Sequence, residues 1–253
     1  MAGKPGLWAV PKKLYNLINL GDKYEIYSRV VPALIVIIPI FFVIFQLLWV
    51  KTSSGTLAAG LGIGGGLEIV MVYWFSKLGH ALGTSKQEKL VKKWGDLPTH
   101  LWVNPDYEKT SAEQKKAWRK ALSKISGLNL EKVVKSGDKS EIKLAIQDAI
   151  RECRNKIRGK PEAKLMNLYL IHFGFSKNMA GMKWLAAFIS LFCTIITCWC
   201  FQETGFHLAL ILIQSFFLFC ALTFLFVDEI VVTRDANTYA QYFYSAVVAI
   251  AEA

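Results

Sequence analysis

Hydrophobic residues are concentrated in four stretches of the chain, and charged residues lie almost entirely outside them. The stretches run from Val30 to Val50, Thr56 to Phe75, Met182 to Phe201 and Gly205 to Val227. Each has about 20 residues, which at ~1.5 Å rise per residue crosses the ~30 Å hydrocarbon layer of a bilayer. The pattern therefore predicts four transmembrane helices.

The connections from Lys51 to Gly55 and from Gln202 to Thr204 are too short to hold a folded domain, so the four stretches pair into two hairpins. Between them, residues 79–181 carry 21 Lys and Arg against 11 acidic residues, and residues 1–29 carry five Lys and Arg. The positive-inside rule therefore places both termini and the insert in the cytoplasm. A signal peptide followed by fewer spans is the alternative, but Asp22 precedes the first stretch and no small-residue cleavage site follows it.

This segregation explains how a chain of 253 residues can be 53% hydrophobic and still carry a net charge of +11. The predicted fold class is an all-α membrane protein with two transmembrane helical hairpins (four spans) and a helical cytosolic insert, expected to be homo-oligomeric. The predicted segments are an amphipathic interfacial segment (1–29), the first hairpin (30–78), a basic helical cytosolic domain (79–181), the second hairpin (182–228) and a C-terminal cytosolic helix (229–253).

Capping residues predict helices within the insert. The run from Thr110 to Glu113 matches a capping box and opens a helix that Gly127 ends, and Ser140 is expected to cap the next helix. The run from Gly95 to Pro98 is expected to end a cytoplasmic extension of the second span. In the C-terminal segment, apolar residues at helical spacing indicate a face that packs on the insert or on a neighbouring subunit.

Basic residues recur at helical spacing on the polar faces of the two insert helices. Together with aromatic residues interleaved among further lysines, they suit phosphate contacts beside base stacking. Solvated faces, or attraction to anionic lipid head groups, are alternatives that charge alone does not separate. The candidate oligonucleotide-binding residues are Lys92, Lys93, Trp102, Lys116, Arg119, Lys120, Lys124, Arg151, Arg154 and Arg158. Lys143 lies on the same helical stripe as Arg151, Arg154 and Arg158.

The second span contains a run of glycines followed by an acidic residue. Gly60 with Gly64, and Gly62 with Gly66, form overlapping pairs of small residues four apart that let helices approach closely and bend. Glu68 lies at about mid-depth, where a carboxylate must be protonated, paired or wetted. These five residues are the candidate pore or gate, although Glu68 could instead fix helix packing through His207 or Gln214.

The sequence shows no catalytic constellation, so the chain is not expected to be an enzyme, and no cofactor or metal is expected. Its four histidines are scattered and it has no metalloprotease or phosphate-binding loop motif. Cys198 and Cys200 could bind a soft metal, but no histidine lies nearby and packing is favoured. Three classes remain, namely a gated pore, a transporter subunit, and a membrane anchor or assembly protein with a lipid-binding basic face.

Three runs in and beside the insert resemble a family of bacterial membrane proteins encoded beside nucleotidyltransferases. The runs are Trp94 to Trp102, Lys116 to Trp118 and Phe173 to Asn178, and their order and position between two hairpins also agree. His100, Ala117 and Ser176 depart from the family pattern. The family is that of the membrane effectors of Hailong-type anti-phage systems.

The resemblance implies a homotetrameric ion channel in the bacterial inner membrane. It further implies that short single-stranded DNA oligomers, made by a partner nucleotidyltransferase, keep the channel closed, and that their loss during infection depolarises the cell. A basic insert and a bendable glycine-rich span agree with that expectation.

Overall fold

The structure, a computed structural model, is helical in every regular element of the residues that it describes, which are 23–51, 54–200 and 207–253. Side chains at 48–51, 54–65, 67 and 207 lie outside this description. The prediction of an all-α protein is confirmed for the described part. The residues outside the description include most of the predicted interfacial segment, residues 52–53 of the first predicted hairpin turn and all of the second turn.

The first apolar stretch forms one nearly continuous helical column. A single turn, α2 (Lys23–Glu25), passes into the π-helix η1 (Ile26–Val30) and then into α3 (Val31–Lys51). Pro39 lies inside α3, and the helix continues past it. The π-helix has one extra residue per hydrogen-bonded ring, a form that is rare in proteins and frequent at functional positions.

Two helices are far longer than a bilayer requires. α4 (Ser54–Trp94) has 41 residues and α9 (Lys164–Cys200) has 37. At ~1.5 Å per residue they are about 60 and 55 Å long, roughly twice the thickness of the hydrocarbon layer. Each predicted boundary of the insert, at 78 and 181, therefore falls inside a continuous helix.

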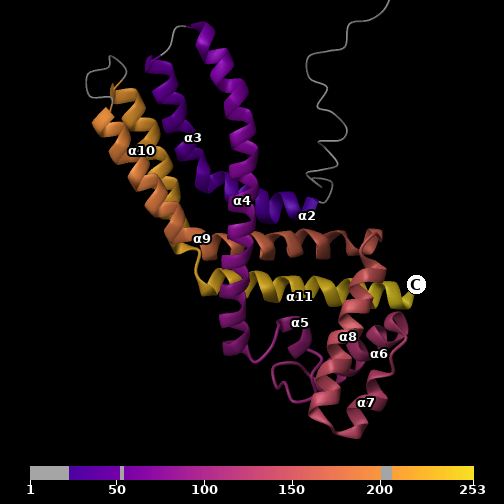
Figure 1. Cartoon of the computed structure of the whole chain (residues 1–253). Coiled ribbons are helices and arrows are strands. Elements are labelled where there is room, and N and C mark those ends of the chain that lie inside the picture. The colour runs from indigo at the N-terminus through magenta and orange to yellow at the C-terminus, as the bar shows by residue number, and fades with distance from the viewer. Residues whose placement is uncertain (1–22, 52–53, 201–206) are drawn as a thin grey trace, which may run out of the picture.

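α3, α10 (His207–Thr223), the second part of α9 and the first part of α4 form an apolar bundle (Figure 1). The short 3-10 helix η3 (Phe224–Phe226) ends it. Three stretches of the described residues are long and apolar enough to cross a membrane, namely Lys23–Leu47, Pro161–Cys200 and Leu208–Phe226. The predicted second span lies in α4, where the side chains of most of its residues are outside the description.

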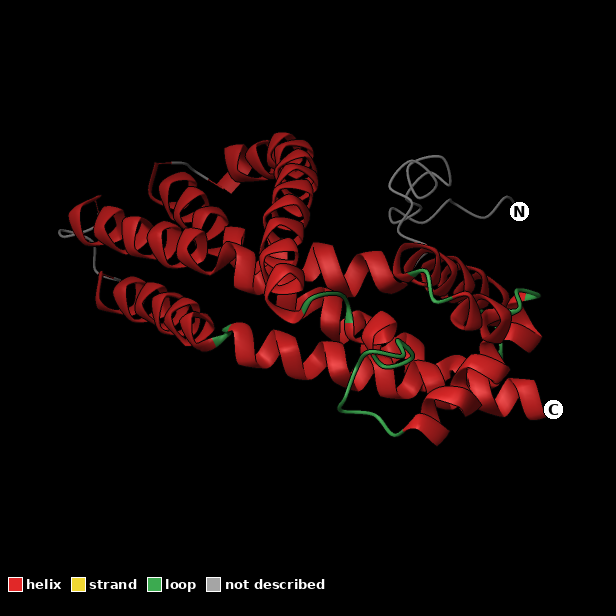
Figure 2. Ribbon diagram, turned by 90° about the horizontal axis from the view of Figure 1, so that it is seen from below, coloured by secondary structure: helices red, strands yellow, loops and turns green. Residues whose placement is uncertain are grey.

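A second body, the helical domain, is formed by the shorter helices together with the first part of α9 (Figures 1 and 2). In Figure 1 the first part of α9 lies alongside α11 (Glu229–Glu252) and across α4. The elements of the domain are α5 (Pro98–Leu101), α6 (Ala112–Ser126), α7 (Leu130–Ser136), α8 (Lys139–Ile157), η2 (Pro161–Ala163) and α11 (Glu229–Glu252).

Local capping fixes the ends of these helices. Ser111 caps α6 by accepting a hydrogen bond from the backbone N–H of Gln114, so the N-cap is one residue later than the Thr110 predicted. Asp138, not Ser140, caps α8, because its carboxylate accepts from the backbone N–H groups of Ser140 and Glu141. Gly127 ends α6 as predicted, with a positive φ of 85° that suits glycine.

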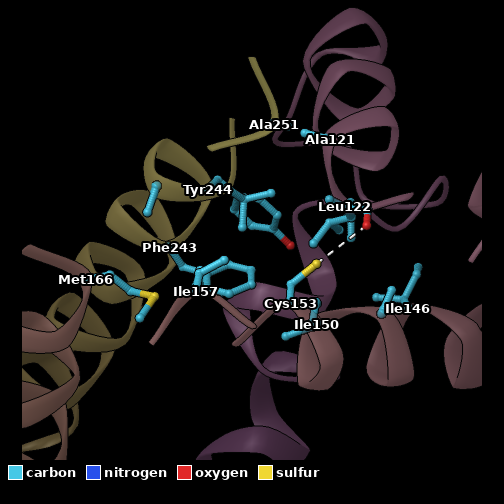
Figure 3. Packing of buried hydrophobic residues seen from close by; sticks show 14 of the residues in the cluster. Ala121, Leu122, Ile146, Ile150, Cys153, Ile157, Met166, Phe243, Tyr244 and Ala251 are labelled. Carbon is cyan, nitrogen blue, oxygen red and sulfur yellow. Dashed lines mark hydrogen bonds between the residues drawn. The ribbon is translucent and has the colours of Figure 1, made fainter. Parts of the chain in front are cut away.

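The core of the helical domain gathers around α11. Phe243 and Tyr244 are completely buried against Leu122 of α6 and the apolar face of α8. Figure 3 shows the thiol of Cys153 directed at the carbonyl of Leu122, at an Sγ to O distance of 3.5 Å. Each fully buried large side chain contributes about 1.5–3 kcal/mol of hydrophobic free energy. α11 is therefore an integral part of the domain rather than an appended C-terminal helix.

α4 and α9 cross in close contact where the bundle meets the domain. A Cβ on Gly83 would lie 2.2 Å from Oδ1 of Asn178, and a Cβ on Gly181 would lie 2.6 Å from the backbone nitrogen of Gly83. Only glycine permits this backbone approach. The crossing fixes how the bundle sits on the domain.

Candidate nucleic-acid interface

Three aromatic rings from distant parts of the chain form a stack in the helical domain. The ring of Trp118 lies 4.5 Å from that of Tyr244 and 5.8 Å from that of Trp102, measured between centroids, and all three planes are within about 20° of parallel. The hydroxyl of Tyr244 donates to the backbone carbonyl of Thr99. Burial raises the pKa of Tyr244 well above its usual value, so the hydroxyl keeps its proton as a donor.

A cleft of ≈ 470 Å³, here called the aromatic cleft, opens beside this stack. Asn237 and Gln241, one turn apart on α11, line it, and Trp102 and Trp118 are half-buried in its wall. Aromatic faces with amide donors and acceptors are what a flat heterocycle such as a nucleobase requires. The other residues that line the cleft are Tyr107, Lys109, Thr110 and Gln114.

A second cleft of ≈ 410 Å³, here called the lysine cleft, lies between α6 and the start of α7. Lys116, Lys120 and Lys124 line it from α6. The ammonium group of Lys124 donates to the carbonyl of Ala251 at the end of α11, whereas the side chains of Lys116 and Lys120 are exposed. Three lysines in one concave surface favour an anion. The remaining lining residues are Ser123, Gly127, Leu128, Asn129 and Glu131.

The two clefts lie on opposite sides of α6. Lys116 and Lys120 are each two residues from Trp118, and two residues rotate a side chain by about 200° around a helix axis. One nucleotide therefore cannot occupy both clefts. A chain of several nucleotides could occupy both only by passing around α6.

Arg119, which the sequence placed beside the stripe of Lys116, Lys120 and Lys124, is buried. Its Nε donates to Glu131 at 2.8 Å and its Nη1 donates to the carbonyl of Val103 at 3.1 Å. Its side chain thus joins α6 to α7 and to the loop after α5. Its donors are used inside the protein.

The basic residues of α8 line neither cleft. Arg151 is exposed and pairs with Asp148 at 2.8 Å, and the guanidinium of Arg154 lies 5.7 Å from the ring centre of Tyr239 on α11. Arg158 is exposed. The stripe on α8 thus lies outside both clefts, and its Arg154 contacts α11.

Lys92, Lys93 and Lys143 lie at a third position, where α4 ends. Lys93 is paired with Glu229 at 2.5 Å and Lys92 is exposed. Lys143 lies 3.6 Å from Asp96. Burial alone would raise the pKa of Asp96, but hydrogen bonds from His100 and from the backbone N–H of Leu97 lower this pKa overall.

The predicted gate residues lie along α4. Glu68 is exposed in the single chain, and no described residue hydrogen bonds to it or pairs with it. Gln214 is fully buried, and its amide has no partner among the described residues. A Cβ on Gly66 would meet nothing within 4 Å, so Gly66 is not a close helix contact within one chain. Gly60, Gly62 and Gly64 lie in α4 where side chains are outside the description.

No sequence pattern marked Asn237, Gln241 or Gln114 as site residues. The apolar spacing of Tyr239 and Phe243 defines the buried face of α11, and Asn237 and Gln241 flank that face. Their nearness to Trp102 is a contact between residues far apart in the chain, which no local pattern reveals. Comparison with protein-family models, curated proteins and solved structures finds no match.

Proposed function

We propose that the chain is the pore-forming subunit of a ligand-gated ion channel, an effector of bacterial anti-phage defence. In this proposal it is a homotetramer in the inner membrane, with four spans and with both termini and the helical domain in the cytoplasm. Short single-stranded DNA oligomers, made by a partner nucleotidyltransferase, bind the domain and keep the pore closed. Release of the oligomers opens the pore and depolarises the membrane.

The continuity of α4 and α9 carries this proposal. Each helix runs without a break from the apolar bundle into the helical domain, and Gly83 and Gly181 hold the two in contact where they cross. A ligand that shifts the domain therefore moves the membrane helices with it. Closure requires that the ligand bind the closed arrangement more tightly than the open one.

The outward surface of the bundle supports an oligomer of this chain. Glu68 is exposed, and an uncompensated carboxylate facing lipid costs several kcal/mol. Several subunits arranged around an axis would place Glu68 on a water-filled lumen and remove that cost. The open surface at Gly66 leaves room for a neighbouring helix on the same side.

The two clefts support a short nucleic acid as the ligand. Stacking on Trp102 or Trp118 with hydrogen bonds to Asn237 and Gln241 suits a base, and the lysine cleft suits a phosphate. Both rival classes lack such an argument: a transporter subunit needs a midplane substrate site, and an anchor needs no ligand cleft.

Binding is tested with the full chain in lipid nanodiscs and a short fluorescent single-stranded DNA. We expect salt-dependent binding that Gln241→Ala weakens at every salt concentration. The double variant Lys116→Gln with Lys120→Gln should lower the salt slope by about 1.4, which is about 0.7 for each phosphate contact with a single strand. Lys135→Gln, an exposed lysine of α7 outside both clefts, is the matched control. If DNA binds no more tightly than a size-matched acidic polymer, the proposal that the ligand is an oligonucleotide is wrong.

Gating is tested separately by ion flux from liposomes that contain the purified chain. We expect the wild-type chain to carry an ion flux that added oligonucleotide suppresses. In Gln241→Ala the oligonucleotide should no longer suppress this flux. Glu68→Gln should change the flux without changing DNA binding. A wild-type chain that binds DNA but carries no flux would contradict the channel. Movement of a solute that occurs only when it is coupled to the gradient of a second solute or ion would instead indicate a transporter.

A further inference from the structure

Three basic side chains lie close together where η1, α4 and α9 join, away from both clefts. They are Arg29 of η1, His80 of α4 and Lys177 of α9. The side chain of Lys177 on α9 is only 8% exposed, yet its ammonium group bonds to an uncharged acceptor, Oε1 of Gln87, at 2.7 Å. It also lies 5.8 Å from the ring centre of Phe173. Within the described ranges, no carboxylate lies within ion-pair distance of Lys177. A buried charge without a counter-ion is unfavourable and requires an explanation.

Arg29 and His80 add further unused donors to the same place. Arg29 uses Nη1 to pair with Glu25 at 2.8 Å, but its Nε is buried and has no partner among the described residues. Nδ1 of His80 is likewise buried without a described partner. His80 interacts electrostatically with the positive charges of Arg29, Lys177 and Lys77, and with the opposing negative charge of Glu25. The junction thus has more positive charge than its own acids neutralise.

The backbone around these groups is held in place. Ser28 and Arg29 belong to the π-helix η1, and Nδ2 of Asn178 donates to the carbonyl of Ser28 at 2.6 Å. Asn178 is in turn in contact with Gly83 of α4. Fixed donors bind an anion with little loss of side-chain entropy, and π-helices are frequent at functional positions.

We propose that Arg29, His80 and Lys177 bind a phosphate group, the anion that guanidinium and ammonium donors suit best. The junction lies between the apolar bundle and the helical domain, and Lys177 precedes the predicted span at Met182 by one turn and a residue. The phosphate of an anionic phospholipid is found at that level of a bilayer. This site is independent of the oligonucleotide proposal, because neither cleft includes any of its residues.

The first test uses the unmodified full chain in a neutral detergent. Its melting temperature is measured with a short-chain phosphatidylglycerol, a short-chain phosphatidylcholine or inorganic phosphate. We expect phosphatidylglycerol to raise the melting temperature more than phosphatidylcholine does, because ligands that bind only the folded state stabilise it. A rise with inorganic phosphate alone would support the same site with a soluble source. No rise with any of the three would overturn the proposal.

Variants then locate the binding, measured by native mass spectrometry with phosphatidylglycerol. Lys177→Gln should weaken binding roughly tenfold, as expected for loss of a charge-assisted hydrogen bond, and Lys177→Arg should retain most of it. Lys89→Gln, an exposed lysine on α4, is the matched control. Equal losses in Lys177→Gln and Lys89→Gln would show surface attraction only and contradict the site.

Glu25→Gln distinguishes a phosphate-binding role of these residues from a purely structural one. It removes the carboxylate that competes for Arg29 and should therefore tighten binding of phosphatidylglycerol several-fold. A loss of binding in Glu25→Gln, with the melting temperature of the ligand-free protein unchanged, would contradict the electrostatic argument.

Discussion

The carboxylate of Glu229, the first residue of α11, lies 3.0 Å from the ammonium group of Lys86, which precedes it by 143 residues on α4. A second ammonium group, that of Lys93, lies 2.5 Å from the same carboxylate. Glu229 thereby ties the start of α11 to two lysines of α4 that lie about two turns apart on the same face. This tie joins the domain core to a helix that continues into the bundle.

Glu229→Gln should lower thermal stability in a pH-dependent way. Hydrogen bonds from Lys93 and Lys86 lower the pKa of Glu229 from 4.5 to about 2. Since folding favours the ionised form, the stabilisation is complete above pH ~4.5 and is lost as pH falls toward 2. The difference in melting temperature between wild type and variant should be small and constant at neutral pH, and should shrink in acid. Because the carboxylate is exposed, salt should also reduce it.

The control is Glu108→Gln, which removes an exposed carboxylate from the loop before α6. Both variants lose one negative charge, so a general effect of net charge would appear in both. An equal pH profile for the two variants would mean that the pairing with Lys86 and Lys93 adds nothing measurable.

Phe243→Ala should destabilise the helical domain by about 3–5 kcal/mol, the usual cost of removing a buried aromatic side chain. Phe243 is completely buried between α11 and the helices α8 and α9. Urea unfolding monitored by tryptophan fluorescence would measure the loss. Leu144→Ala, on the exposed face of α8, should change stability by less than about 0.5 kcal/mol.

For the same reason, removing residues 237–253 should expose the domain core to protease rather than detach a dispensable segment. A truncated chain with the protease resistance of wild type would contradict the placement of α11.

Gly181→Ala should destabilise the crossing of α4 and α9 by about 1–3 kcal/mol, the typical cost of overpacking. The added Cβ would lie 2.6–2.7 Å from backbone atoms of Leu82 and Gly83, which cannot move independently. Gly159→Ala, in the turn after α8, is a matched control, because its Cβ would meet nothing within 4 Å. Thermal unfolding in detergent compares the two, and equal melting temperatures would refute the close contact.

Cys153 should resist alkylation in the folded protein. Burial raises the pKa of its thiol to about 12, so almost no thiolate exists at the pH of a maleimide reaction. Labelling of a chain that retains only Cys153 should require denaturant. The positive control is the same chain with Leu144→Cys, which places a thiol on the exposed face of α8. Rapid native labelling of Cys153 would mean that the core opens readily.

Local patterns predicted much of the helical domain correctly. The apolar residues that recur at helical spacing along α8, from Ile142 through Cys153 to Ile157, are all buried. The glycine that ends α6 was also predicted, because a residue with positive φ leaves a clear signal in the sequence. Both features depend on residues within a few turns of each other.

Contacts between distant residues account for what the sequence did not reveal. Arg119 lies next to a basic stripe in the sequence, and only the fold shows that Glu131 and the carbonyl of Val103 accept hydrogen bonds from it. The aromatic cleft likewise depends on α11 meeting Trp102. Helical periodicity specifies which face of a helix is buried, but not which other helix covers that face.

The position of Phe243 and Tyr244 in the core has a consequence for biosynthesis. Leu122 and the apolar face of α8 are translated well before α11, with α9 and α10 between them. The core of the domain therefore cannot be completed before α9 and α10 have been translated, and until then Leu122 and the apolar face of α8 lack the two aromatic side chains that cover them.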